Sequence, residues 1–282
     1  MWEFSSLIRL WDRQLVLKQR RIIEEVMLMI RNKFRKHNDD YNELIERDFC
    51  DALITSRNVS LRDGKQWASY LTDENLAMIV YDLFFAGNDT TQRTFQWLLL
   101  LIAYYPDVQK RLKDEIESHI GDRRARHEDR QQCPYTMAMM AETLRYRNVA
   151  RFGVTHKAMV DTKIGEIFVR KGTDVGVYQG IILDSSDYWD KPDMFRPERF
   201  LDSDGNYMTN RPQAYIPFGL GRRVCLGERL AIADLFLVLV RFLQLTKDYD
   251  IILNSHNGLD PDPNVAESYL PKEYTICFKN KN

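Results

Sequence analysis

The sequence has few cysteines, almost no net charge and no long apolar run. Its 282 residues include four cysteines, which lie far apart and form no Cys-x-x-Cys pair. This spacing excludes a disulfide framework and fits a reducing compartment. The formal net charge of −1 argues against a nucleic-acid-binding protein. The longest apolar runs, such as 97–103, are shorter than the ~20 residues that cross a bilayer, so the given sequence shows neither a signal peptide nor a transmembrane span.

The sequence does contain the pattern of a globular, mainly α-helical protein with a small β region. Its residues are 44% hydrophobic and 29% charged, and the chain is long enough for a full core in one or two domains. Apolar residues at helical spacing predict helices over 1–37, 43–56, 72–105, 106–119, 135–146 and 226–245. A loop is expected over 58–69, and short β-type runs predict strands over 163–169, 173–178, 248–253 and 274–278.

Cys225 is the residue with the clearest chemical signal. It belongs to the pattern Phe-x-x-Gly-x-Arg-x-Cys-x-Gly, whose fixed positions are Phe218, Gly221, Arg223, Cys225 and Gly227. An apolar run follows, so the cysteine is expected where a loop enters a helix, and amide groups at a helix start stabilise a thiolate. We interpret the loop as one that delivers a cysteine thiolate to haem iron. A thiolate bound there donates electron density that favours O–O cleavage. The alternative, a small buried hydrophobic cysteine, does not explain the two glycines and the arginine at fixed spacing.

Three further segments accompany this loop in order along the chain. They are Ala86-Gly-Asn-Asp-Thr-Thr, Glu142-Thr-Leu-Arg and Phe195-Arg-Pro-Glu-Arg-Phe. Together with the cysteine loop over 218–227, these segments resemble those of the cytochrome P450 family, over about 48–278. The resemblance implies a partial cytochrome P450 domain over 1–282, with an oxygen-activating helix over about 72–105 and a Glu-x-x-Arg helix over about 135–146.

By this resemblance, Thr90 and Asp89 are expected to act in oxygen activation. A threonine hydroxyl can bond the carbonyl four residues earlier and bend a helix, which would open a groove for O2 and water. Asp89 points about 100° away from Thr90 on a helix and would link the site to bulk water. A hydroxyl and a carboxylate suit the proton delivery that the reaction needs. The alternative is a mid-helix kink with a solvated aspartate.

The Glu-x-x-Arg segment is expected to have a structural role. Glu142 and Arg145 are three residues apart and share one face of a helix, and Arg199 is expected to join them in a buried cluster. Breaking such a cluster costs about 3–5 kcal/mol. The alternative, an exposed ion pair at this spacing, contributes only about 0–1 kcal/mol.

The resemblance also implies residues that hold haem b. Cys225 is the expected iron ligand, and Arg223 suits a clamp on a haem propionate. His156 matches the position that contacts the other propionate, although a lone histidine is more often structural. Phe218 opens the loop that carries the ligand.

Substrate contacts are expected from three segments, 76–85, 149–154 and 266–270. Their apolar residues suit a lipophilic substrate, with core packing as the alternative. The residues expected to line the substrate site are Phe85, Ala86, Val149 and Val154. Arg151 departs from this apolar pattern and is expected to extend to a propionate or to solvent.

The stretch 156–166, with 171–174, resembles animal microsomal members and is most similar to the steroid 17-alpha-hydroxylase/17,20-lyase group. Thr155 stands where that group usually has proline. The resemblance implies a monooxygenase that inserts one atom of O2 into a lipophile such as a steroid, at the cytosolic face of the endoplasmic reticulum membrane. NADPH-cytochrome P450 reductase is the implied electron donor, with Arg222 as a candidate docking residue.

Family members typically carry an N-terminal membrane anchor and a longer region before the cysteine, so a large N-terminal part is expected to be missing here. Other readings remain open at this point: a truncated chain that binds haem weakly or not at all, a member that acts on fatty acids or xenobiotics, and a haem-thiolate isomerase or dehydratase that needs no O2.

Overall fold

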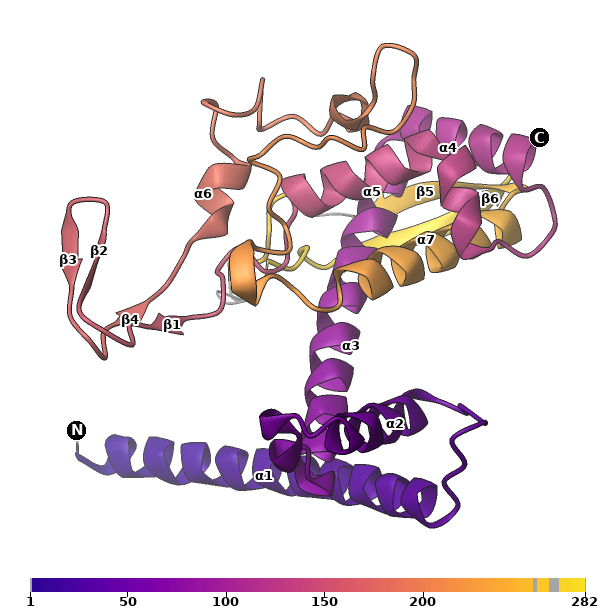
Figure 1. The fold of residues 1–282 in the computed structure, drawn as a ribbon. Coiled ribbons are helices and arrows are strands. Elements are labelled where there is room, and N and C mark those ends of the chain that lie inside the picture. The colour runs from indigo at the N-terminus through magenta and orange to yellow at the C-terminus, as the bar shows by residue number, and fades with distance from the viewer. Residues whose placement is uncertain (1, 256–257, 264–268, 282) are drawn as a thin grey trace. The chain divides into compact units, whose positions relative to one another are not determined.

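The computed structural model describes residues 2–255, 258–263 and 269–281. The chain forms two compact units, Met1–Asn88 and Asp89–Asn282. Helices predominate in both units and short antiparallel strand pairs make up the sheets (Figure 1), which confirms the prediction of a mainly α fold with a small β region. In the ranges described, no helix combines the length and the apolar character that a membrane span requires.

The first unit is built from helices around a small core. Its elements are α1 (Trp2–Asp39), α2 (Phe49–Arg62), the short 3-10 helix η1 (Gln66–Tyr70) and the first part of α3 (Asp73–Tyr104). Each of the three α-helices contributes buried apolar side chains, which are Met27, Ile30, Phe34, Cys50, Ile54, Leu76 and Ala77. The hydrophobic effect on this shared cluster holds the three helices together.

Helix α2 begins and ends later than the sequence predicts. The expected helix over 43–56 and loop over 58–69 are both wrong, because the helix covers Phe49–Arg62 and η1 follows it. Asp48 starts the helix, since its carboxylate accepts a hydrogen bond of 2.9 Å from the amide of Cys50. Gly64, at φ +64°, follows its end.

A buried histidine joins α1 to α2. His37 on α1 is 8% exposed, and its Nδ1 lies 2.7 Å from Oδ1 of Asp51. Arg47 donates to the other oxygen of Asp51 through Nε at 2.7 Å. Hydrogen bonding from Arg47 is the largest cause that holds the pKa of Asp51 below its usual range. The buried carboxylate is therefore fully paired.

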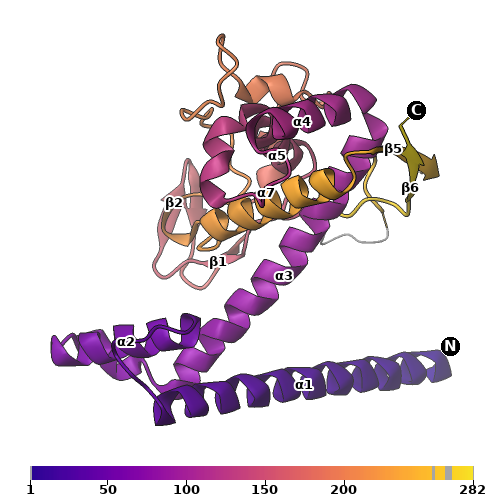
Figure 2. The same ribbon diagram turned by 90° about the vertical axis from the view of Figure 1, so that its right-hand side faces the viewer.

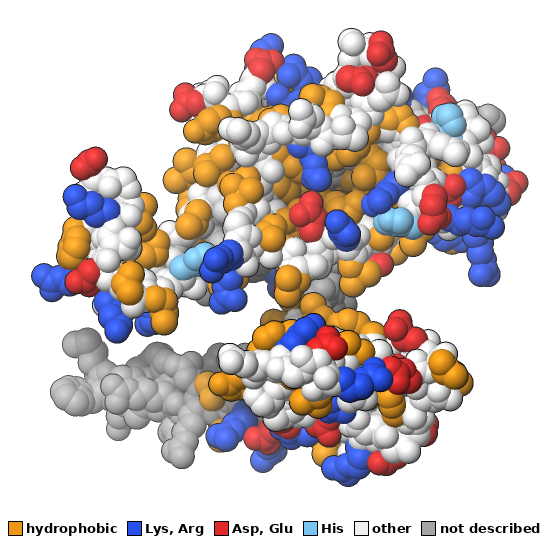
Figure 3. Space-filling model, viewed as in Figure 1, with side chains coloured by type: hydrophobic (Ala, Val, Ile, Leu, Met, Phe, Trp, Pro, Cys, Tyr) orange, Lys and Arg blue, Asp and Glu red, His pale blue; other side chains and the backbone are white. Residues whose placement is uncertain are grey.

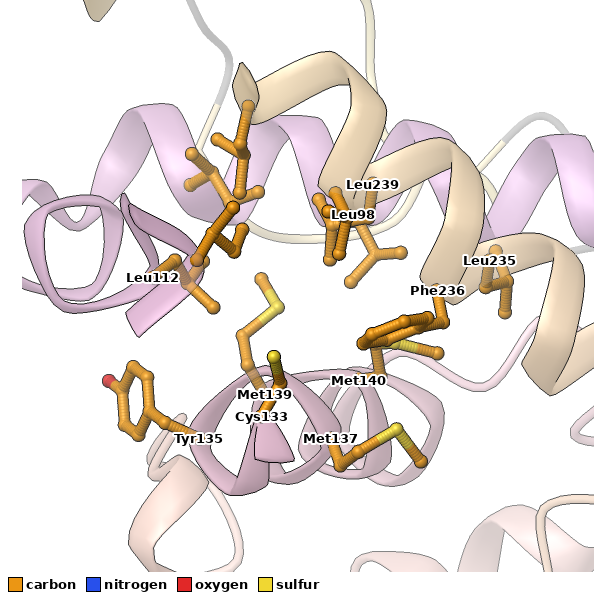
Figure 4. Packing of buried hydrophobic residues seen from close by; sticks show 14 of the residues in the cluster. Leu98, Leu112, Cys133, Tyr135, Met137, Met139, Met140, Leu235, Phe236 and Leu239 are labelled. Carbon is orange, nitrogen blue, oxygen red and sulfur yellow. The ribbon is translucent and has the colours of Figure 1, made fainter. Parts of the chain in front are cut away.

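The second unit contains the larger core. The rest of α3 packs with α4 (Pro106–His119), α5 (Pro134–Tyr146) and α7 (Glu228–Leu245), and Figure 2 shows these helices side by side. Methionines of α5 meet leucines of α3, α4 and α7 in the cluster drawn in Figure 4. The residues labelled there are Leu98, Leu112, Cys133, Tyr135, Met137, Met139, Met140, Leu235, Phe236 and Leu239.

The boundaries of these helices follow from particular residues. Pro106 and Pro134 each occupy the first turn of a helix, where the missing N–H removes no intrahelical bond. Gly121, at φ +62°, follows α4, and its amide donates to the carbonyl of Ile116 at 2.9 Å. The predicted helices over 106–119 and 135–146 agree with α4 and α5 within one residue.

Three two-stranded antiparallel sheets occur in the described part of the chain. They pair β1 (His156–Lys157) with β4 (Asp174–Val175), β2 (Thr162–Ile164) with β3 (Ile167–Val169), and β5 (Tyr249–Ser255) with β6 (Thr275–Asn280). The single run expected over 163–169 is two strands, because Gly165 adopts φ +58° and turns the chain. The other elements are α6 (Gln179–Leu183), η2 (His127–Gln132), η3 (Pro197–Phe200) and η4 (Gly221–Arg223).

The C-terminal hairpin is fixed to the helices by one side chain. Gln109 of α4 is 5% exposed, and its Nε2 donates to the carbonyls of Ile102 at 3.3 Å and Ile251 at 2.9 Å. Its Oε1 accepts from the amide of Ile251 at 2.9 Å. This buried amide therefore satisfies backbone groups of both α3 and β5.

Candidate functional site

Cys225 lies in the loop between η4 and the start of α7. Its amide donates to the carbonyl of Phe218 at 2.9 Å, which closes the loop on itself. Gly219 and Gly221 adopt φ +78° and +73°, values that L side chains rarely take. A Cβ at Gly227 would lie 3.8 Å from the sulfur of Cys225. The thiol is exposed at the beginning of an 18-residue helix, where amide dipoles favour an anion.

The neighbouring predicted residues are accessible. Arg223 is exposed two residues before the cysteine, and the ring of Phe218 is half-buried while its carbonyl holds the cysteine amide. His156 is exposed on β1, paired in register with Val175 of β4. The structure therefore places Phe218 and Arg223 in one loop with Cys225, and leaves His156 on a separate strand.

Glu142, Arg145 and Arg199 come together in a buried cluster. Glu142 and Arg145 have no exposed surface, and two hydrogen bonds of 2.8 Å join them. Nε of Arg199 donates to Oε1 of Glu142 at 3.1 Å, and the amide of Arg196 donates to the same oxygen at 2.9 Å. Burial is the largest cause that lowers the pKa of Arg199. One carboxylate thus joins α5 to the segment around η3.

Thr90 and Asp89 lie on α3, where the second unit begins. The helix is continuous from Asp73 to Tyr104, through Gly87 and both residues. Asp89 pairs with Arg93 at 2.7 Å, and the carbonyl of Thr90 accepts from the hydroxyl of Thr94 at 2.9 Å. The side chain of Thr90 is exposed. The two candidate residues therefore sit on adjacent positions of an intact helix.

The whole chain is similar to proteins of one known family. The sequence model described as "Cytochrome P450" matches residues 1–277. The chain belongs to the cytochrome P450 family. It is 38% identical over 222 residues to the steroid 17-alpha-hydroxylase/17,20 lyase of Oryzias latipes, which covers 77% of this chain and 43% of that protein.

Other members of the family are similar to the chain over a comparable length. Cytochrome P450 2K6 of Danio rerio is 32% identical over 274 residues, covering 95% of this chain and 53% of the relative. Cytochrome P450 2C13, male-specific, of Rattus norvegicus is 39% identical over 213 residues, which cover 75% of this chain and 42% of the relative. The chain spans about half the length of the curated relatives it matches.

The cytochrome P450 family uses haem, and the donor set around Cys225 fits that group. The porphyrin of haem would itself supply most of the ligands to its iron, so one protein thiolate would suffice. Among the described residues, the three-ligand cluster able to hold a bare metal ion is His37, Asp48 and Asp51, which does not include Cys225. Gly227 leaves room beside the sulfur, and the exposed cation of Arg223 suits a propionate.

A porphyrin also needs apolar surface, and the second unit exposes it next to the loop. Figure 3 shows hydrophobic side chains gathered on this unit. In the loop region the exposed apolar residues are Leu220, Val224, Leu226 and Leu230. In the segments paired by the bridge between Phe152 and Tyr178 they are Phe152, Val154, Val177 and Ile181. Large exposed apolar patches mark binding sites for apolar groups.

The predicted substrate residues differ in exposure. Val149 is buried at 9% exposure, whereas Val154 is 80% exposed and Phe85 is 67% exposed. Ala86 is exposed as well. Phe85 and Ala86 belong to the first unit and the two valines to the second. Of the segment 266–270, only Tyr269 and Leu270 lie within the described residues.

Arg151 is buried at 7% exposure rather than extended into solvent. Its Nη2 donates to the carbonyl of Gly180 at 3.1 Å and pairs with the carboxylate of Asp184. The guanidinium carbon lies 4.4 Å from the ring centroid of Tyr269. A Cβ at Gly180 would stand only 2.6 Å from Nε of Arg151. The arginine therefore occupies space that only a glycine leaves open.

Gln179 is a residue near the site that sequence reasoning missed. It is 9% exposed, and its Nε2 lies 3.1 Å from the place a Cβ would take at Gly153. Its Oε1 lies 4.0 Å from the equivalent place at Gly219 in the cysteine loop. Two glycines separated by more than sixty positions thus accommodate one side chain, a relation that no local pattern reveals.

Proposed function

We propose that the chain is the haem-thiolate part of a monooxygenase that inserts one oxygen atom from O2 into a C–H bond of a steroid. The observation that carries the proposal is Cys225, whose thiol is exposed at the start of α7 in a loop closed by its own amide. Bound haem b would supply the redox chemistry, in which the second oxygen atom leaves as water after two electrons and two protons are added.

Each site residue has a role in this proposal. Cys225 would be the iron ligand, Phe218 would fix its loop through the 2.9 Å backbone bond, and Arg223 and His156 would pair with the propionates. Thr90 would pass protons to the reacting oxygen, and Asp89, which points about 100° away on the same helix, would link the site to bulk water.

The buried cluster has no part in the chemistry. Glu142, Arg145 and Arg199 would hold α5 against the η3 segment, so that the surface around the cysteine loop keeps its shape. Val149 and Val154 would contact a lipophilic substrate in the second unit. For Phe85 and Ala86, which belong to the first unit, substrate contact stays a prediction from the family resemblance.

The choice of a steroid rests on the relatives. Proteins named steroid 17-alpha-hydroxylase/17,20 lyase from Oryzias latipes and Gallus gallus are each 38% identical to the chain. Relatives of other names match as closely, so a screen should begin with steroids and continue with other lipophiles. NADPH-cytochrome P450 reductase at the endoplasmic reticulum membrane is the proposed electron source, with the exposed Arg222 at its docking face.

The ferrous–CO difference spectrum of the haem-supplied chain tests the proposal. A band typical of a thiolate ligand is expected for the parent, and Cys225→Ser should abolish it, whereas Cys277→Ser, which changes the other exposed cysteine, should not. An unchanged band in Cys225→Ser would show that the ligand is another residue. The absence of a thiolate band in the parent would favour the alternative of a chain in which Cys225 does not bind haem.

A further inference from the structure

Asn148 lies buried between the end of α5 and the loop that carries Cys225. It is 2% exposed and follows α5 by two residues. Its Nδ2 donates to the carbonyls of Leu144 and Pro217, each at 3.1 Å. Its Oδ1 accepts from the amide of Ala150 at 2.9 Å. Both amide protons and the amide oxygen are therefore used.

The bond to Pro217 connects this side chain to the cysteine loop. Pro217 is buried and immediately precedes Phe218, whose carbonyl accepts the amide of Cys225 at 2.9 Å. A buried carbonyl without a partner is costly, so the Asn148 amide determines where this carbonyl can lie. The path from Asn148 to Cys225 thus consists of two hydrogen bonds, which accept on the carbonyls of the adjacent residues Pro217 and Phe218.

We propose that Asn148 is a positioning residue for Cys225. It sets the direction in which the chain enters the loop, and through the Phe218 carbonyl it sets the orientation of the cysteine backbone. That the sulfur then meets haem iron rests on the proposed function, but the positioning itself is a property of this chain and is measurable without haem.

Gln109 offers a matched control. It is also a buried side-chain amide with two donated bonds and one accepted bond, at 5% exposure. Its partners are Ile102 and Ile251, so it joins α3 and α4 to β5 and makes no bond to the cysteine loop. Gln109→Ala therefore removes the same chemistry as Asn148→Ala from a different place in the same unit.

Amide hydrogen exchange in the haem-free full chain is the first test. In Asn148→Ala, exchange of the Cys225 amide should accelerate about tenfold, the scale of one lost hydrogen bond with its buried partner. Asn148→Asp should behave similarly, because a carboxylate cannot donate to Leu144 and Pro217. Gln109→Ala should accelerate exchange at Ile251 and leave Cys225 at the parent rate. An unchanged Cys225 rate in both Asn148 variants, or an equal acceleration in Gln109→Ala, would overturn the proposal.

The parent chain provides a test that does not depend on variants folding. As denaturant is raised in small steps, the Nδ2 protons of Asn148 and the amide of Cys225 should become exchangeable together. Exchange of the Cys225 amide with the Asn148 protons still protected would show that the loop opens independently, and would overturn the proposal.

The haem-loaded chain gives a spectroscopic readout. Asn148→Ala should increase the share of the ferrous–CO form that lacks a thiolate, while Gln109→Ala should keep the parent share. Equal shares in the two variants would count against positioning by Asn148. A parent without any thiolate band would contradict the proposed function, and the exchange experiment would still decide the role of Asn148.

Discussion

The carboxylate of Glu142 and the guanidinium of Arg145 form two hydrogen bonds of 2.8 Å at positions with no exposed surface. Arg145 also donates to the carbonyls of Leu183 and Pro192, each at 2.9 Å. The pair therefore satisfies one carbonyl at the end of α6 and one in the loop that follows, as well as its own charges. Removing one partner of such a pair strongly lowers the free energy of unfolding, because the other partner is left as a buried charge without water or a counter-charge.

We expect Glu142→Gln to lower the free energy of unfolding of the second unit by about 3–5 kcal/mol. The matched control is Glu198→Gln, which removes the partner of Arg111 at a half-exposed surface site and should cost about 0–1 kcal/mol. Urea unfolding followed by circular dichroism measures both values. Similar losses for the two variants would mean that the buried cluster contributes no more than a surface pair.

Gly180 and Arg151 should show strong energetic coupling. Gly180→Ala places a methyl group 2.6 Å from Nε of Arg151 and should destabilise the second unit by about 1–3 kcal/mol. Once Arg151 is replaced by alanine the clash disappears, so the double variant should be no less stable than Arg151→Ala alone. A double-mutant cycle from urea unfolding checks this. Additive losses would show that the backbone moves to admit the methyl group.

Cys133 should make the second unit less stable at alkaline pH. The thiol is fully buried, and burial raises its pKa to about 12, against about 8.5 in an unfolded chain. Because the folded-state pKa is the higher one, the stabilisation is complete below about pH 8.5 and declines as pH rises toward 12.

The comparison is between the parent and Cys133→Ala. From about pH 8.5 to about pH 9.5 the parent should lose about 1 kcal/mol relative to the variant. Burial lowers the pKa of Lys113 to about 8, so this lysine makes the folded state more stable as pH rises. Both proteins contain Lys113, so its contribution cancels in the difference between their stabilities. A stability difference that does not vary with pH would contradict the expectation.

Asp51 should make the first unit sensitive to acid. Its pKa is held below the usual range, chiefly by hydrogen bonding from Arg47. The stabilisation is therefore present above about pH 4, the unfolded value, and is lost as pH falls further. Asp51→Asn should weaken the unit near neutral pH and flatten its response to acid in urea unfolding. Asp39→Asn, at an exposed position on α1, should retain the parent response.

Thr90→Ala should uncouple electron use from product formation if the proposed function holds. With reductase and substrate present, less product and more hydrogen peroxide should form per NADPH consumed, because a proton-delivering hydroxyl is lost. Thr91→Ala is the control, since the next residue on α3 points about 100° away. Equal coupling in parent and Thr90→Ala would remove Thr90 from the mechanism.

Patterns within single helices could be predicted from the sequence, and contacts between distant segments could not. The spacing of Glu142 and Arg145 indicates a shared face, and the structure joins them directly. Nothing in the sequence indicates that the amide of Arg196 would share the same carboxylate, because that contact depends on how a loop of irregular backbone is placed.

The same limit applies to Asn148. An asparagine after a helix indicates a turn, and its bond to the amide of Ala150 is such a local contact. Its partner Pro217 lies 69 positions further along the chain, in a loop without periodicity. The prediction of where α2 begins was wrong for a different reason. The apolar spacing indicated an earlier start, but the helix begins after Asp48, whose carboxylate caps its first turn.

The tight fit between Gly180 and Arg151 also restricts how this sequence could have arisen. With any larger residue at 180, an arginine at 151 would meet a side chain where it now meets only a glycine. A lineage that gained the arginine first would have passed through a strained intermediate, whereas one that gained the glycine first would not. Ancestral reconstructions of this position pair should therefore place the glycine before the arginine.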